Sequence, residues 1–189
     1  QSKTIQEIAF AAYTNHPQGL EAGLEATHYY DPPNLTFPFG SYICVVDIDP
    51  KTYEIKIRRF IAIDDCGNII NPMVVEGQIH GGLTQGLAPA MYEELTYDED
   101  GNILNGSLMD YLVPTAVETP NWETDQTVTP SPHHPLGAKG VAESPTVGAP
   151  PAIANAIIDA LSHLGIESMD IPITPYKIWQ ALHDKKIAA

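Results

Sequence analysis

The sequence predicts an α+β domain in which helices pack on an antiparallel or mixed sheet. Short apolar segments bounded by turn residues are typical of strands, and several of them come in pairs that can form hairpins. The predicted order of strand pair, helix, strand pair, strand, helix and helix suits this architecture. A chain of 189 residues, 43% hydrophobic and 17% charged, also has a globular composition. We expect one domain spanning residues 1–189.

The first third of the chain is expected to form a short helix and a strand hairpin. Residues 4–13 place their apolar side chains on one helical face. Residues 21–38 are polar and aromatic with two adjacent prolines, and they predict a loop or an edge strand. Residues 41–48 predict a buried strand, and residues 53–64 are expected to pair back on it as a hairpin.

A helix is predicted from Pro72 to about residue 94, because Asn71 suits the N-cap and proline suits the first helical position. Each glycine inside such a helix weakens it by up to ~1 kcal/mol relative to alanine. This helix nevertheless carries four of them, which are Gly77, Gly81, Gly82 and Gly86. We therefore expect either a close approach to its backbone or tight packing against other helices.

The second half of the chain is expected to add a hairpin, a strand and two helices. The hairpin covers residues 95–104 and the strand covers residues 123–128. A helix is predicted over residues 147–164 and ends at Gly165. The last helix is predicted to begin after Thr174 and to end near residue 185.

The composition excludes several classes of function. With a net charge of −15 and only nine Lys and Arg residues, the chain has no basic stripe for nucleic acid. Its apolar runs are far shorter than a membrane span, and its start does not resemble a signal peptide. Its two cysteines do not suggest a disulfide scaffold. We expect a soluble, cytoplasmic protein with reduced thiols, whose acidity serves solubility or a basic partner subunit.

The stretch "GAKGVAESP" is the first candidate site, because it places one carboxylate, Glu143, among small residues just before a predicted helix. Glycines let backbone amides approach a ligand, and a helix start offers further free N–H groups. A carboxylate in such a place can act as a general base. The alternative is that Glu143 only caps the helix, and the spacing alone leaves both interpretations open.

Residues 64–86 form the second candidate site, with the sequence "DDCGNIINPMVVEGQIHGGLTQG". Gln78 and Gln85 lie on one face of the predicted helix, two turns apart. Their amides can donate and accept hydrogen bonds with a polar ligand, although both could equally be solvated. The adjacent His133 and His134 lack the spacing of a metal site, so we predict none.

Together these two stretches resemble the molybdenum hydroxylases, the family of xanthine oxidase, aldehyde oxidoreductase and the large subunit of aerobic carbon monoxide dehydrogenase. Residues 64–86 look most like the carbon monoxide dehydrogenase type, and "GAKGVAESP" looks like the glutamate loop of the family. The resemblance covers residues 20–182. It implies that the chain is the C-terminal part of a molybdopterin-binding large subunit.

The resemblance implies roles for individual residues. Glu143 would be the active-site base beside molybdenum, and Gln78 would contact the pyranopterin. The cofactor would be molybdenum bound by molybdopterin, usually as the cytosine dinucleotide. The backbone expected to lie against it belongs to Lys139, Gly140, Val141 and Ala142.

The resemblance also implies partners, which are the remainder of the large subunit, an iron–sulfur subunit and a flavin subunit. The substrate would be a small molecule, with carbon monoxide, aldehydes and N-heterocycles all open. Because the large subunit of the family is several times longer, we expect this chain alone to be inactive and free of cofactor. Cys66 is not assigned to copper. The alternative function is a non-catalytic acidic binding or scaffold module with the family fold.

Overall fold

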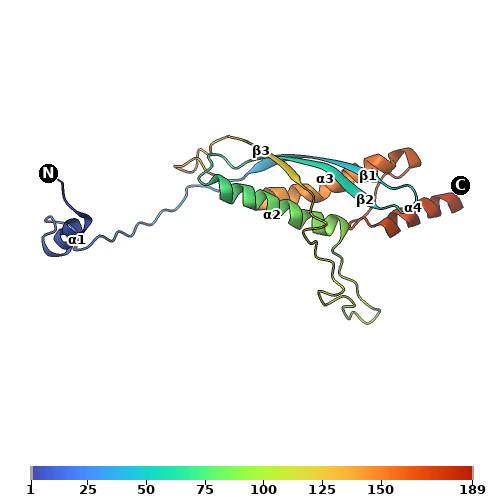
Figure 1. Cartoon of the computed structure of the whole chain (residues 1–189), viewed down its shortest axis with the longest axis horizontal. Helices are drawn as coiled ribbons and strands as arrows, with labels where there is room; N and C mark the ends of the chain where they lie inside the picture. The colour runs from blue at the N-terminus through green and yellow to red at the C-terminus, as the bar shows by residue number, and fades with distance from the viewer. Residues whose placement is uncertain (1, 189) are drawn as a thin grey trace. The chain divides into compact units, whose positions relative to one another are not determined.

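The computed structural model describes residues 2–188 and divides the chain into two compact units, Gln1–Pro32 and Pro33–Ala189. The first unit contains helix α1 (Ile5–Thr14), and the second contains the sheet and the other helices (Figure 1). The expectation of one domain over residues 1–189 remains a prediction.

The predicted N-terminal helix is confirmed as α1, and its start is explained by a capping box. The hydroxyl of Thr4 accepts a hydrogen bond from the Glu7 backbone N–H, and the Glu7 carboxylate accepts one from the Thr4 N–H. None of its residues is buried, so its apolar face finds no core within this unit. The following residues, 21–38, form loop as expected.

The second unit is built on a three-stranded mixed sheet with the order β1-β2-β3. Strand β1 (Phe39–Ile48) pairs antiparallel with β2 (Ile55–Asp65), and β2 pairs parallel with β3 (Trp122–Thr127). The turn of the hairpin is closed by Asp49, whose carboxylate accepts from two backbone N–H groups. The predicted hairpin and the later strand are thereby confirmed.

Helices α2 (Pro72–Met91) and α3 (Glu143–Leu161) pack side by side on one face of this sheet (Figure 1). A 3₁₀ turn (Ser162–Leu164) and helix α4 (Pro175–Ala188) complete the unit. The predicted α+β class, with helices on a mixed sheet, is confirmed. The core between the layers is formed by buried side chains of both, among them Phe60, Ile79, Leu83, Leu87, Ile153 and Ile157.

The expectation that residues 41–48 form a buried strand is wrong for one of its two faces. Tyr42, Cys44 and Val46 point toward the helices, whereas Ile43 is 57% exposed and Val45 is 39% exposed on the other side. The reason is that the helices cover only one face of the sheet and that β1 is an edge strand. On the covered side, burial raises the pKa of the Cys44 thiol to about 12.

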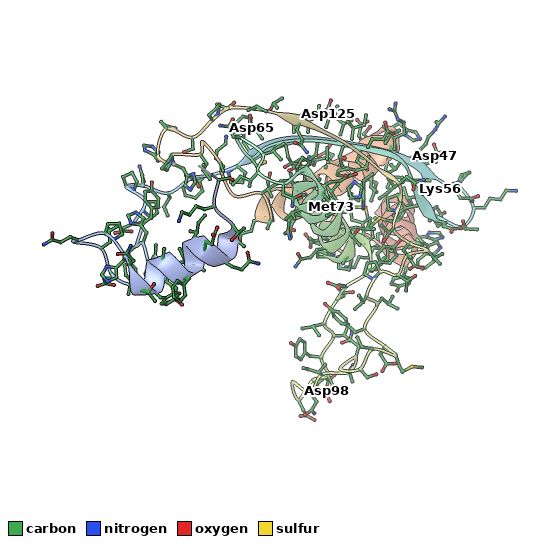
Figure 2. All side chains as sticks on the ribbon, turned by 60° about the vertical axis from the view of Figure 1, so that its left-hand side comes forward. Asp47, Lys56, Asp65, Met73, Asp98 and Asp125 are labelled. Carbon is green, nitrogen blue, oxygen red and sulfur yellow. The ribbon has the colours of Figure 1, made fainter. Side chains whose placement is uncertain are left out.

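The predicted hairpin over residues 95–104 is present only as an irregular loop. It forms a single antiparallel bridge between Tyr97 and Ile103, beside a turn in which the Asp98 carboxylate accepts backbone N–H groups. Both bridged side chains are exposed, so no apolar face holds regular strands together. The loop projects from the layers, with Asp98 far out on it (Figure 2).

The four glycines of α2 form two pairs, one packed against α3 and one facing open space. A Cβ added at Gly82 would lie 2.5 Å from Pro145 Cγ, and one at Gly86 would lie 2.7 Å from the Ala149 Cβ. These two glycines therefore let α2 and α3 pack closely. At Gly77 and Gly81 a Cβ would meet no atom of another described segment within 4 Å, so helix packing does not explain them.

The substitution Gly86→Ala is expected to destabilise the fold by about 1–3 kcal/mol, because the new methyl group would overlap α3. The matched substitution Gly81→Ala on the same helix is expected to stabilise the fold by up to about 1 kcal/mol, since alanine is the better helix former. Urea-induced unfolding followed by circular dichroism measures both free energies. Equal effects at the two positions would contradict this division.

Candidate functional site

The "GAKG" loop lies against the segment that follows β2. Lys139 N–H donates to the Cys66 carbonyl at 2.7 Å, and Asn68 N–H donates to the Gly137 carbonyl at 3.0 Å. Gly67 and Gly137 both have positive φ, and a side chain on Gly67 would collide with the Gly137 carbonyl. The loop is thus tied to one end of the sheet, which Asp65 marks in Figure 2.

A buried ion pair between two side chains also holds this loop. Lys139 Nζ lies 2.9 Å from Asp65 Oδ1, and the two side chains are 8% and 0% exposed. The Asp65 carboxylate also accepts from Gly67 N–H, Thr127 Oγ1 and Thr129 N–H, at 2.9 to 3.1 Å. The charge of Lys139 is therefore neutralised inside the protein, beneath the loop.

These donors change the protonation of Asp65. Burial alone would raise the pKa of this carboxyl, but the Lys139 ammonium and the N–H groups outweigh burial and lower the pKa well below its usual range. The pKa of an aspartate in an unfolded chain is roughly 3.9. The stabilisation from this pair is therefore complete above about pH 4 and is lost as the pH falls toward the folded-state pKa.

Helix α3 begins at Glu143, one turn before the predicted start at residue 147. The preceding residue, Ala142, makes no side-chain cap, and Pro145 falls in the first turn, where proline is tolerated. These two residues hid the start of the helix from the sequence pattern. Glu143 is thus a first-turn residue, a position that favours acidic side chains, and it is exposed in this chain.

Glu143 lines a cavity of about 370 Å³ together with Gln78. The structure thereby brings together three of the predicted site residues, Gln78, Ala142 and Glu143, from segments far apart in the chain. The predicted residues Lys139, Gly140 and Val141 do not line this cavity, and Val141 packs against the core instead. The cavity walls come from α2 and from the start of α3 and consist of Gly77, Gln78, Gly81, Gly82, Gln85, Ala142, Glu143 and Thr146.

Two polar side chains of this cavity were outside the predicted set. Gln85 lies on the same helix face as Gln78, which the spacing indicated, but it was not assigned to the cofactor. Thr146 was missed because the helix was predicted to begin after it. Its hydroxyl donates to the Gly82 carbonyl at 3.2 Å and lies 3.4 Å from the Gln85 side-chain oxygen, so it links the two helices.

Glu143 also borders a second cavity, of about 600 Å³, on the other side of α3. Its walls are mainly apolar and include Phe37, Phe39 and Val147, with Tyr42 as one of the few polar groups. Glu143 therefore stands between a polar, glycine-lined cavity and a more apolar one. A carboxylate in this place can exchange a proton with groups bound on either side.

Within residues 2–188, no three His, Cys, Asp or Glu side chains gather in an arrangement that could hold a metal ion. In the same part of the chain, no helix is both long and apolar enough to cross a membrane.

Comparison with known proteins gives consistent matches. The sequence model of the molybdopterin cofactor-binding domain matches residues 1–120. The chain is 60% identical to the carbon monoxide dehydrogenase large chain of Hydrogenophaga pseudoflava, over 98% of this chain and 23% of that protein. It is 39% identical to the nicotine 6-hydroxylase large subunit of Paenarthrobacter nicotinovorans, over 94% of this chain and 22% of that protein. The reconstituted carbon monoxide dehydrogenase from Oligotropha carboxidovorans has a TM-score of 0.89 at 54% identity, over 99% of this chain and 23% of that chain.

The chain thus spans less than a quarter of the length of these relatives. The family model ends before the loop that carries Glu143, but the alignment with the Hydrogenophaga protein extends over 186 residues and takes that loop in.

The substitution Lys139→Met is expected to destabilise the fold by about 3 kcal/mol at pH 7, because it leaves the buried Asp65 carboxylate without its cation. The deficit should shrink as the pH falls below about 4 toward the folded-state pKa, because the unfolded Asp65 carboxyl then binds a proton that the paired one does not. Chemical unfolding at several pH values measures it. The control is Lys177→Met, which removes the more exposed pair with Glu94 and should cost under about 1 kcal/mol. An equal loss in both variants would refute a special role for the buried pair.

Proposed function

The chain belongs to the molybdopterin cofactor-binding domain family of the molybdenum hydroxylases, and from this membership we propose that it forms one wall of the active site in an oxidoreductase large subunit. The observation that carries the proposal is the cavity that Glu143 shares with Gln78. We assign Glu143 as the active-site base. Gln78 and Ala142 would contact the cofactor in this cavity, and the backbone of residues 139–141, which lies outside its walls, would contact it from the adjoining loop.

The residues of the cavity fit a flat, polar cofactor such as molybdopterin. The open space above Gly77 and Gly81 would be filled by side chains at any other residue, so the α2 backbone is free for close approach. The amides of Gln78 and Gln85 can pair with the amide-like edges of a pterin. When bound, molybdenum–molybdopterin supplies two-electron redox chemistry. The cytosine dinucleotide form is part of this proposal.

Of the substrates that the sequence leaves open, we propose carbon monoxide. The support is the much higher identity to a carbon monoxide dehydrogenase large chain than to a nicotine hydroxylase subunit. The largely apolar cavity on the second side of Glu143 also suits a small uncharged molecule. The complete enzyme would contain the rest of the large subunit, together with iron–sulfur and flavin subunits that carry electrons away. A cytoplasmic location remains a prediction.

The alternative is a non-catalytic acidic module that keeps the family fold. The exposed position of Glu143 and the net charge of −15 are compatible with it. It does not explain why two glycines weaken α2 where no described residue packs against them. The two functions differ in what they require of Glu143, which makes this residue the deciding test.

In the complete enzyme, Glu143→Gln is expected to lower carbon monoxide oxidation at least about 100-fold, because an amide cannot accept the proton. Molybdenum and pterin contents should stay at the wild-type level, since the shape of the wall is preserved. The assay is reduction of methylene blue under carbon monoxide, with metal analysis in parallel. Glu167→Gln, an exposed residue outside both cavities, is the matched control and should be fully active. Wild-type turnover in the Glu143 variant would exclude the base role.

Residues 1–189 produced alone are expected to fold but to bind far less than one molybdenum per chain. Affinity for a cofactor requires preorganised contacts from all sides, and this chain supplies one wall. Elemental analysis of the purified protein, with circular dichroism as the check on folding, measures this. Near-stoichiometric molybdenum would show that the chain contains a complete site.

A further inference from the structure

Asp64 is a second buried carboxylate, and it contacts Ser144, the residue that follows the candidate base. Asp64 is 1% exposed, and its Oδ1 accepts hydrogen bonds from the Tyr42 hydroxyl at 2.5 Å and from Ser144 Oγ at 2.7 Å. The two hydroxyl oxygens are themselves 2.8 Å apart. The other carboxylate oxygen, Oδ2, is buried and has no hydrogen-bond partner in the described part of the chain. None of these three residues belongs to the predicted site.

The three side chains come from three different elements. Tyr42 lies on β1, Asp64 lies at the end of β2, and Ser144 lies in the first turn of α3. Ser144 directly follows Glu143 in the chain. The hydrogen bonds of Ser144 therefore fix the start of α3, and with it the backbone of Glu143, against the sheet.

Tyr42 has little freedom to leave this arrangement. A side chain at Gly148 would collide with its ring, and one at Gly40 would collide with its hydroxyl, so the phenol fills a slot between α3 and β1. Burial, followed by the hydrogen bond to Asp64, raises the pKa of Tyr42, so its hydroxyl keeps the proton that it donates. The Tyr42 phenol and the Asp64 carboxylate therefore hold the Ser144 hydroxyl in a fixed position.

The neighbouring acid holds the other end of the same segment. Successive strand residues point to opposite sides, so Asp64 reaches α3 while Asp65 reaches Lys139. Glu143 lies between these two attachment points, four residues after Lys139 and one before Ser144. Both flanks of the candidate base are therefore tied to the same end of β2.

We propose that Asp64, acting through Ser144 and Tyr42, is a positioning residue that sets the place of Glu143 between the two cavities. This inference rests on the proposed function of Glu143 as the base. Proton transfer needs the base within hydrogen-bond reach of its partner, and misplacement by about 1 Å can cost on the order of 100-fold in rate. Loosening the first turn of α3 should therefore slow turnover even though the Glu143 carboxylate itself is retained.

Replacing the buried Asp64 itself risks unfolding, so the two hydroxyl donors are the better probes. In the complete enzyme, Ser144→Ala is expected to lower kcat for carbon monoxide oxidation about 10-fold, with KM and molybdenum content unchanged. Tyr42→Phe should lower kcat in the same direction. Ser144→Thr, which keeps a hydroxyl, should restore most of the rate. The matched control is Ser162→Ala at the far end of α3, whose hydroxyl donates to the Asp159 carbonyl of the same helix, and it should retain full activity.

A second measurement does not depend on turnover. Hydrogen–deuterium exchange of the complete subunit without cofactor should show faster exchange, by about 5-fold or more, in the peptide covering residues 143–149 of the Ser144→Ala variant. The N–H groups of Val147 and Gly148 report on the first turn, because in an α-helix they bond to the carbonyls of Glu143 and Ser144. Exchange around Ile157, in the buried part of the same helix, should not change.

The outcomes separate the two proposals. Wild-type turnover in Glu143→Gln would refute the base role itself. An inactive Glu143→Gln enzyme combined with a Ser144→Ala enzyme as fast as the Ser162→Ala control would refute positioning alone. Loss of molybdenum from Ser144→Ala, or no recovery in Ser144→Thr, would assign the cluster to folding and would also overturn the inference.

Discussion

The adjacent carboxylates of Asp64 and Asp65 are the constraint on which the candidate site depends. Removing two charges from water is costly, and here the cost is offset because each carboxylate accepts hydrogen bonds from residues distant in the chain. Asp64 holds the first turn of α3, and Asp65 holds the loop before it. The segment that carries Glu143 cannot move from the sheet without leaving a buried charge short of its partners. Loop position and fold stability are therefore coupled.

Helix α2 serves the fold and the site with the same residue type. Gly82 and Gly86 allow α3 to pack closely, and this packing sets the distance between Glu143 and the amide side chains of α2. On the opposite flank, the helix presents bare backbone at Gly77 and Gly81 and gains no packing in return. A local weakness of this kind is expected at functional positions, and here it faces the cavity that Glu143 lines.

The sequence predicted well those features that have a local chemical cause. Asn71 and Thr174 are explicit caps, and the two helices that follow them begin where the sequence predicts, whereas the first helix is predicted from its apolar face. The start of α3 was missed because Ala142 makes no cap, and Thr146 was lost from the site with it. The bond between Ser144 and Asp64 joins residues 80 positions apart, so no local pattern could reveal it. The burial of β1 was overestimated because its apolar residues occupy both faces of the strand.

The exposed apolar face of β1 affects how the polypeptide associates in solution. The uncovered side of the sheet presents Ile43, Val45 and Ile63 to water, and β1 leaves its outer row of backbone donors and acceptors unpaired by any described strand. An unpaired edge strand next to an exposed apolar surface binds other extended chains. At high concentration such a chain is another copy, so the behaviour of this piece in solution should change with dilution. In a larger subunit, polypeptide from elsewhere could occupy the same edge and remove that tendency.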